Sequence, residues 1–270
     1  MADNEAIRAF EHAGWQRAAS SYEASFATAT RQFIPELLDA ADVRSGRSVL
    51  DVACGPGFVA AGAAERGAMV RGLDFSSAML EVARARHPGI MFDQGDAEAL
   101  SYPDNHFDAV VSNFGIHHVP QPRLALSQTH RVLRSGGSVA FSIWAAPADN
   151  IAWKLVFDAI RRCGDMSASR APAPGGALGG MSDCVAALES AGFVGIESHK
   201  LTGLWRQTDG QALLGALRSG TARMAALIEA QAPEAISAIV AHIDREAAEF
   251  RNADGLAIPI AALITHGRKA

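Results

Sequence analysis

The chain has 270 residues, of which 49% are hydrophobic and 20% charged, and its formal net charge is -5. This composition is typical of a globular protein with one large core, and the negative charge gives no broad attraction to phosphates, so we expect no nucleic-acid partner. No apolar run reaches the ~18 residues of a membrane span, and the N-terminal stretch lacks the apolar core of a secretory leader.

The first two thirds of the chain predict an alternation of helices and strands. Residues 3–45 are expected to be helical, because apolar residues such as Ile7, Phe10 and Trp15 recur at helical spacing. Short apolar runs then predict strands at 48–53, 68–74, 90–95, 107–114 and 138–145. The amphipathic segments between them predict helices at 57–66, 76–86 and 121–134. Strands separated by such helices pair in parallel through right-handed crossovers, which indicates a doubly wound α/β sheet.

The last third is less regular. We expect a helix at 150–163, a loop or lid rich in Pro, Gly and Ala at 167–183, a helix at 182–191 and a strand at 194–205. Two or three helices follow within 209–251, and a last strand lies at 258–267. The predicted fold is a seven-stranded, mostly parallel sheet with its last strand antiparallel and with helical cap elements. Residues 1–206 together with 253–270 would form the main domain, and 207–252 a helical insert in the substrate cap.

A short motif after the first strand carries most of the chemical information. Asp51 lies near the end of that strand, and Gly55 and Gly57 permit a tight turn in which backbone N–H groups can approach a ligand. The two glycines also fit a dinucleotide site, with Asp74 as the ribose acid. Asp51 argues against that alternative, because a carboxylate would repel the pyrophosphate that binds at a helix N-terminus. A ligand with an ammonium and a sulfonium, such as S-adenosylmethionine, suits Asp51 better.

This motif resembles the first motif of the class I S-adenosylmethionine-dependent methyltransferases of the small-molecule type, notably the ubiquinone and menaquinone C-methyltransferases. The resemblance covers roughly residues 45–145, and Ala53 stands where the family often has glycine. Acidic and polar residues at the ends of the later strands occur in the same order as the later motifs of the family. The cofactor-binding residues that the resemblance implies are Asp51, Ala53, Gly55, Gly57, Asp74, Phe75, Met79, Asp96, Ala97, Asn113, Phe114 and, from the N-terminal segment, Tyr22.

The resemblance also implies roles for some of these residues. Asp74 would accept hydrogen bonds from both ribose hydroxyls, Met79 would pack on the adenine, and Asp96 would accept from the adenine amino group. Each residue also has a plainer interpretation. Asp51 or Asp96 could only form a turn, Asp74 could cap the next helix, and Met79 or Tyr22 could belong to the core.

Two histidines are candidates for a general base. His117 and His118 follow the strand 107–114, where the acceptor should bind, and histidine suits proton transfer near neutral pH. On an extended backbone only one of the pair can face the pocket, and we favour His117. The alternative is that both bind the loop around Pro120 and Pro122. Adjacent residues of a strand cannot chelate together, and no cluster of oxygen ligands stands out, so we predict no metal.

The reaction implied by the resemblance is transfer of a methyl group from S-adenosylmethionine to an O, N or C atom of a small molecule by direct displacement. Apolar insert residues and tryptophans 144, 153 and 205 favour an apolar or aromatic acceptor, unless they only pack the cap. A nucleoside-binding module without turnover and a nicotinamide-dependent oxidoreductase remain alternatives. Cysteines 54, 163 and 184 lack the spacing of a zinc site or a disulfide frame, which favours reduced thiols in the cytoplasm. The sequence does not indicate the oligomeric state.

Overall fold

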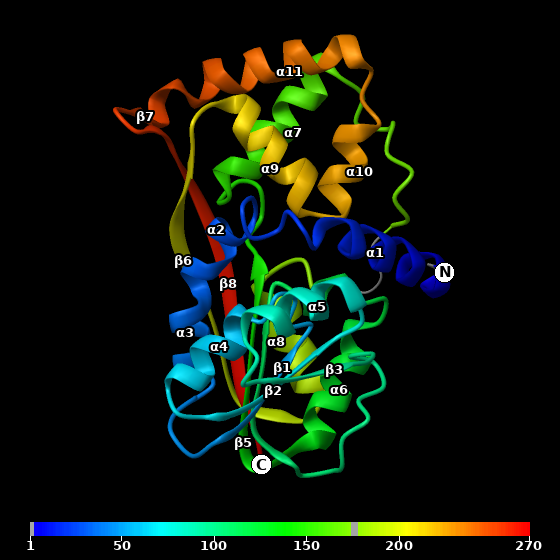
Figure 1. The fold of residues 1–270 in the computed structure, drawn as a ribbon, viewed down its shortest axis with the longest axis vertical. Coiled ribbons are helices and arrows are strands. Elements are labelled where there is room, and N and C mark those ends of the chain that lie inside the picture. The colour runs from blue at the N-terminus through cyan, green and yellow to red at the C-terminus, as the bar shows by residue number, and fades with distance from the viewer. Residues whose placement is uncertain (1–2, 174–177) are drawn as a thin grey trace.

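The computed structural model describes residues 3–173 and 178–270. At its centre is a sheet with the strand order β3-β2-β1-β4-β5-β8-β6 (Figure 1). The parallel strands are β1 (Ser48–Val52), β2 (Met69–Asp74), β3 (Met91–Gln94), β4 (Phe107–Asn113) and β5 (Leu133–Trp144). The long strand β8 (Gly255–Lys269) is antiparallel both to β5 and to β6 (Phe193–Gln207). The predicted doubly wound sheet with an antiparallel last strand is confirmed.

Two details of the sheet differ from the prediction. β5 begins at Leu133, ahead of the expected residue 138, because the chain continues pairing with β4 across an irregularity around Gly136, whose φ is +75°. Glycine tolerates this left-handed conformation without a steric cost. In addition, a two-residue strand β7 (Arg251–Asn252) pairs with the start of β8, so the sheet has eight strands.

The two faces of the sheet have separate hydrophobic cores. Successive strand residues point to opposite faces, so Val49 packs with α3 (Ile34–Ala40) and α4 (Phe58–Glu65), while Leu50 packs with α6 (Pro122–Val132) and α8 (Met181–Ser190). α5 (Ser77–Arg86) packs along β2 and β3. Burial on both faces explains the consecutive apolar residues within β1, β4 and β5, such as Val110 and Val111. The carboxyl ends of β1, β2 and β4 consequently meet at one edge of the sheet.

A second helical layer lies beyond that edge, at the top of Figure 1. It contains α9 (Gly210–Gly220), α10 (Arg223–Glu229) and α11 (Pro233–Glu246), which lie within the predicted insert, together with α7 (Ile151–Cys163). The N-terminal helix α1 (Asn4–Ala18) lies between this layer and the sheet, and the short α2 (Ala27–Thr30) leads from it to α3. The division into a main domain and a substrate-cap insert remains a prediction. No single helix among the described residues is long and apolar enough to cross a bilayer.

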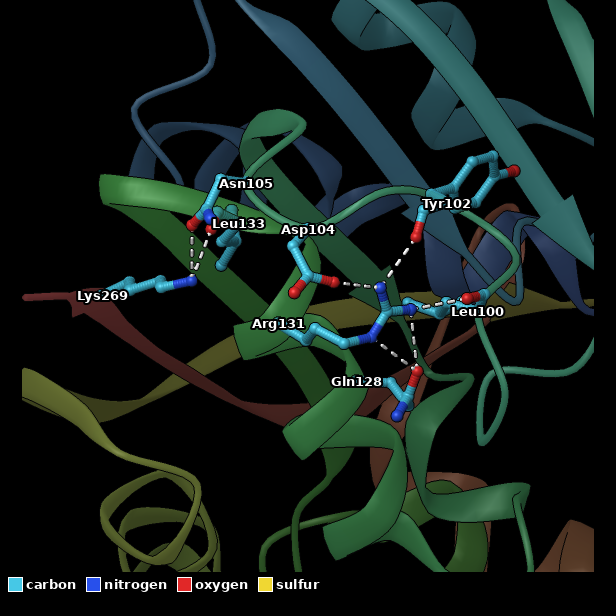
Figure 2. Close-up of polar contacts among 8 residues, drawn as sticks. All are labelled: Leu100, Tyr102, Asp104, Asn105, Gln128, Arg131, Leu133 and Lys269. Carbon is cyan, nitrogen blue, oxygen red and sulfur yellow. Dashed lines mark hydrogen bonds and ion pairs between the residues drawn. The ribbon is translucent and has the colours of Figure 1, made fainter.

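The basic stretch 131–134 serves the fold. Arg131, at the end of α6, donates to the carbonyl oxygens of Leu100 and Tyr102 at 2.6 and 2.8 Å and to the Asp104 carboxylate at 2.7 Å (Figure 2). Beside it, Lys269 joins the Leu133 carbonyl to Asn105. These contacts fix the loop that follows Asp96 and Ala97.

Candidate active site

A cavity lies at the carboxyl ends of β1, β2 and β4, beneath α1. The empty space in the cavity and in its solvent-open mouth together is about 990 Å³. Ligands of open α/β sheets bind at this edge. The lining contains every cofactor-binding residue expected from the sequence except Gly57, namely Tyr22, Asp51, Ala53, Gly55, Asp74, Phe75, Met79, Asp96, Ala97, Asn113 and Phe114.

The turn after β1 has the conformation that its glycines permit. Gly55 and Gly57 have φ of +51° and +83°, and Gly57 is the N-cap of α4. A Cβ on Gly57 would lie 2.8 Å from Cζ of Phe92, so this glycine permits close packing instead of touching the cavity. Ala53 also has a left-handed φ, of +56°, which strains an L-residue by about 1–2 kcal/mol. The N–H groups of Cys54, Gly55 and Gly57 in this turn donate to the Leu73 carbonyl, the Asp74 carboxylate and the Cys54 carbonyl, so the turn is tied to the end of β2.

Two buried carboxylates flank this turn. Oδ2 of Asp51 accepts from the Ala60 N–H at 3.0 Å, and its Oδ1 is buried with no hydrogen-bond partner among the described residues. Asp74 accepts from the backbone N–H groups of Gly55 and Ser76, both at 2.8 Å. Burial raises the pKa of Asp51 well above its usual value and that of Asp74 to about 6. The structure therefore holds two carboxylates that a cationic or hydroxyl-bearing ligand would stabilise in their charged form.

The third acid, Asp96, already has a cationic partner. Its Oδ2 contacts the Arg8 guanidinium of α1, which also contacts Glu98, and its Oδ1 accepts from the Glu98 N–H at 2.9 Å. Neither Arg8 nor Glu98 was singled out from the sequence. The Tyr22 hydroxyl lies 3.2 Å from Thr30 Oγ1, and burial raises its pKa to about 12, so the hydroxyl stays protonated.

The end of β4 turns sharply. Asn113 donates to the Thr30 carbonyl at 3.1 Å and accepts from Ser142, and Phe114 then takes a φ of +55°. The Phe114 ring stacks on Trp144, with ring centroids 3.9 Å apart. Trp144 of β5, Trp153 of α7 and Trp205 of β6 pack together beside the upper helical layer, and none of them lines the described cavity. The proposal that these tryptophans form the acceptor pocket therefore gains no support here.

The expectation of an extended histidine pair is wrong. Because β4 ends at Asn113 and the left-handed Phe114 turns the chain, residues 116–118 form one turn of 3₁₀-helix. The rings of His117 and His118 lie close, with centroids 4.2 Å apart. His118 lines the cavity and His117 does not. Burial, with the nearby His118 and Arg223 charges, lowers the pKa of His117 well below its usual value, which makes it the poorer proton acceptor.

The N-terminal helix contributes residues that the sequence analysis missed. Glu11 and Trp15 of α1 line the cavity, and Glu11 is buried on the helix face that also carries Ile7 and Trp15. A carboxylate inside an apolar stripe of helical spacing was the available signal, because such a residue is rarely buried unless paired. Within residues 3–173 and 178–270, no group of three His, Cys, Asp or Glu side chains could hold a metal ion.

The fold and cavity agree with the comparisons to known proteins. A family model described as "Methyltransferase domain" matches residues 50–141, which span β1 to β5 and most of the cavity's polar residues. This part of the chain is therefore similar to a methyltransferase domain. The demethylmenaquinone methyltransferase of Renibacterium salmoninarum is 41% identical to it over 118 residues, covering 44% of this chain and 50% of that protein. The malonyl-[acyl-carrier protein] O-methyltransferase of Erwinia billingiae is 34% identical over 168 residues, covering 57% and 61%.

Solved structures extend the likeness to the whole methyltransferase fold. The Haemonchus contortus phosphoethanolamine N-methyltransferase 2, solved with phosphomonomethylethanolamine and S-adenosylhomocysteine, superposes with a TM-score of 0.54 at 19% identity, covering 88% of this chain and 53% of that one. The chain spans only about half to three fifths of the length of the curated relatives named above. The matched family model lies within the part of the chain that forms the cavity floor.

Proposed function

We propose that this protein transfers a methyl group from S-adenosylmethionine to an O, N or C atom of a small molecule by direct displacement. The observation that carries the proposal is the buried Oδ1 of Asp51, which has no protein partner and belongs to a residue that lines the cavity beside a left-handed glycine turn. An unpaired buried carboxylate is costly unless a ligand compensates it. A cationic ligand would do so, whereas the pyrophosphate of a nicotinamide dinucleotide would be repelled.

The described residues fit this cofactor. Asp51 would bind its ammonium, and Asp74 would accept from the ribose hydroxyls through the lone pairs that its two N–H donors leave free. Phe75 and Met79 would pack on the adenine from the same edge of the cavity. Asp96 could accept from the adenine amino group alongside or in place of Arg8, which it contacts in the described structure. Tyr22 would cover the cofactor from the N-terminal segment.

The bound sulfonium supplies an electrophilic methyl group, and the protein's task is then to orient an acceptor and to remove its proton where it has one. His118, on the cavity lining, is the better candidate for the base, and His117 is the alternative. A base contributes about 10²–10⁴-fold. His118→Ala should therefore lower kcat by that order with an O–H acceptor and leave cofactor affinity intact, whereas His117→Ala should have a smaller effect.

The acceptor class follows from the relatives and the cavity. One relative's name refers to demethylmenaquinone and another's to a malonyl thioester carrier, so ring and carboxyl acceptors both belong in a first panel. The cavity wall is mostly apolar, with aromatic contributions from Trp15, Phe58 and Phe114, which favours an apolar or aromatic acceptor. The three cysteines are free thiols, in keeping with a cytoplasmic location.

The experiment is a methyl-transfer assay with tritiated S-adenosylmethionine against a panel of quinols, phenols, carboxylic acids and amines. The proposal predicts label in at least one acceptor and its loss in Asp51→Asn. Tight binding of S-adenosylhomocysteine without label in any acceptor would favour the binding module without turnover. Binding of NAD or NADP in place of S-adenosylhomocysteine would favour the oxidoreductase and contradict the proposal.

A further inference from the structure

A buried ion cluster joins the cavity to its cover. Glu11 of α1 is only 1% exposed, although it is a carboxylate on a helix that covers the cavity. Its Oε2 accepts from the Trp15 indole N–H at 3.0 Å and lies 3.2 Å from Nδ1 of His118, which is an ion-pair distance without the alignment of a hydrogen bond. Its Oε1 lies 2.6 Å from Nε of Arg223. One carboxylate therefore contacts both the candidate base and a cation from another helix.

The charge state of Glu11 follows from these neighbours. Burial alone would raise the pKa of the Glu11 carboxyl, but His118 in its protonated form, the Arg223 charge and the Trp15 N–H outweigh burial, so the pKa is lowered. When His118 is neutral, Arg223 and the Trp15 N–H still favour the ionised carboxylate. Glu11 is consequently an ionised acceptor at neutral pH. An ionised carboxylate beside Nδ1 favours the tautomer with its proton on Nδ1, which leaves Nε2 as the free base.

Arg223 connects the cluster to two more covering segments. It belongs to α10 of the upper helical layer, donates to the Pro172 carbonyl at 2.7 Å, and lies over the Phe10 ring of α1 with its guanidinium carbon 5.5 Å from the ring centroid. The same interface is tight elsewhere, since a Cβ on Gly14 would lie 2.4 Å from Cβ of Ala222. α1, α10 and the segment at Pro172 therefore converge on one arginine.

We propose that Glu11 is the positioning residue for His118 and that Arg223, from the helical cover, holds Glu11 in place for it. The proposal rests on the proposed function, in which His118 accepts the proton. With Glu11 on Nδ1, Nε2 would take the proton of an acceptor O–H or N–H as the acceptor atom gains the methyl group and the sulfonium becomes a neutral thioether. Glu11 would balance the positive charge on the imidazolium until the proton passes to water.

The desolvation free energy of the buried Glu11–Arg223 pair makes a purely structural role a poor explanation for it. A buried ion pair often stabilises a fold no better than apolar residues of similar volume, because desolvation offsets the attraction between the charges. Glu11 and Arg223 could therefore be replaced together by leucine and methionine without loss of the fold. The pair is better explained by what it does to His118, which is the third member of the cluster.

The test combines a spectroscopic and a kinetic readout. We expect ¹⁵N-histidine NMR, with the His118 signal assigned by its absence in His118→Asn, to show the Nδ1–H tautomer in the wild type and a shift toward Nε2–H in Glu11→Gln. kcat with a protonated acceptor should fall about ten- to hundredfold, and S-adenosylhomocysteine affinity should stay within about twofold. Glu5→Gln, an exposed glutamate of the same helix, is the matched control and should change neither readout.

The double variant Glu11→Leu/Arg223→Met guards against misfolding of the single variant. It should melt near the wild-type temperature yet show the tautomer shift and the loss in kcat. An unchanged His118 tautomer in Glu11→Gln or in a folded double variant would overturn the proposal, whatever the activity. If the tautomer shifts but the wild type methylates no acceptor, the positioning role holds and the proposed function fails, so the two failures are distinguishable.

Discussion

Replacing Asp51 by asparagine should stabilise the ligand-free protein and weaken cofactor binding at the same time. In the wild type the Asp51 carboxylate is 1% exposed, its Oδ2 accepts one N–H from Ala60, and its Oδ1 has no partner among the described residues. Burial raises the pKa of Asp51 well above its usual value, because the charged form is poorly solvated. An asparagine would keep the bond to Ala60 through its carbonyl oxygen and remove the charge.

The two effects have estimable sizes. Removal of the poorly solvated charge should raise the free energy of unfolding, but the asparagine Nδ2 would take the place of Oδ1 and stay without a partner, which limits the gain to about 1 kcal/mol. For a chain of this size that corresponds to a few degrees in Tm. Loss of a charge-assisted hydrogen bond to the ligand's ammonium should cost about 1.5–3 kcal/mol, or about ten- to hundredfold in Kd.

Differential scanning calorimetry and isothermal titration with S-adenosylhomocysteine measure both quantities on one protein sample. Asp39→Asn is the matched control, because Asp39 is an exposed carboxylate, paired with Arg66, that does not line the cavity. It should leave the affinity unchanged. A folded Asp51→Asn variant that binds S-adenosylhomocysteine as well as the wild type would refute the assignment of Asp51 to the ammonium.

Four further outcomes are expected. Folding raises the pKa of Asp74 from 3.8 to about 6, so the native state binds a proton more readily than the unfolded state. The free energy of unfolding without ligand, measured in urea, should therefore fall by about 3 kcal/mol as pH rises from about 4 through 6, while the affinity for S-adenosylhomocysteine rises. A flat pH profile would contradict this. In thermal melts, Gly57→Ala should lower the free energy of unfolding by about 2–4 kcal/mol, because backbone strain adds to a clash with Phe92. Gly55→Ala should lower it by about 1–2 kcal/mol, because its Cβ meets nothing within 4 Å. Equal losses would be evidence against the packing role of Gly57. Arg131→Gln should lower the free energy of unfolding by about 2 kcal/mol in urea titrations through its lost carbonyl contacts, and no loss would show that these contacts are dispensable. Methyl transfer should survive EDTA, and activity that disappears and returns with magnesium would overturn metal independence.

Much of the site could be predicted because its determinants are local. The order of strand, acid, glycine turn and helix around Asp51, Gly55 and Gly57 follows from hydrophobic pattern and turn chemistry within ten residues. Parallel pairing then brings the end of β2, with Asp74, beside this turn without any knowledge of side-chain packing. The antiparallel last strand was also predicted, whereas the order of the strands in the sheet was not.

The errors and omissions have tertiary causes. The histidine pair was expected on an extended backbone, but a left-handed conformation at Phe114, stacked on Trp144, ends the strand early, and no local propensity of phenylalanine indicates it. Glu11 and Arg223 are 212 positions apart in the numbered sequence, and only the packing of α1 on α10 joins them. The long-range cluster was therefore invisible to pattern analysis, although a buried acid on an apolar helix face was visible in outline.

The central claim is that the cavity at the ends of β1, β2 and β4 binds S-adenosylmethionine. Isothermal titration of the wild-type chain with S-adenosylhomocysteine, followed by NAD and NADP as comparison ligands, tests it most directly. The account predicts one saturable site for S-adenosylhomocysteine and no heat of binding with either dinucleotide. In Asp74→Ala, the Kd for S-adenosylhomocysteine should rise about tenfold or more. Saturable binding of NAD or NADP with no heat from S-adenosylhomocysteine would contradict it.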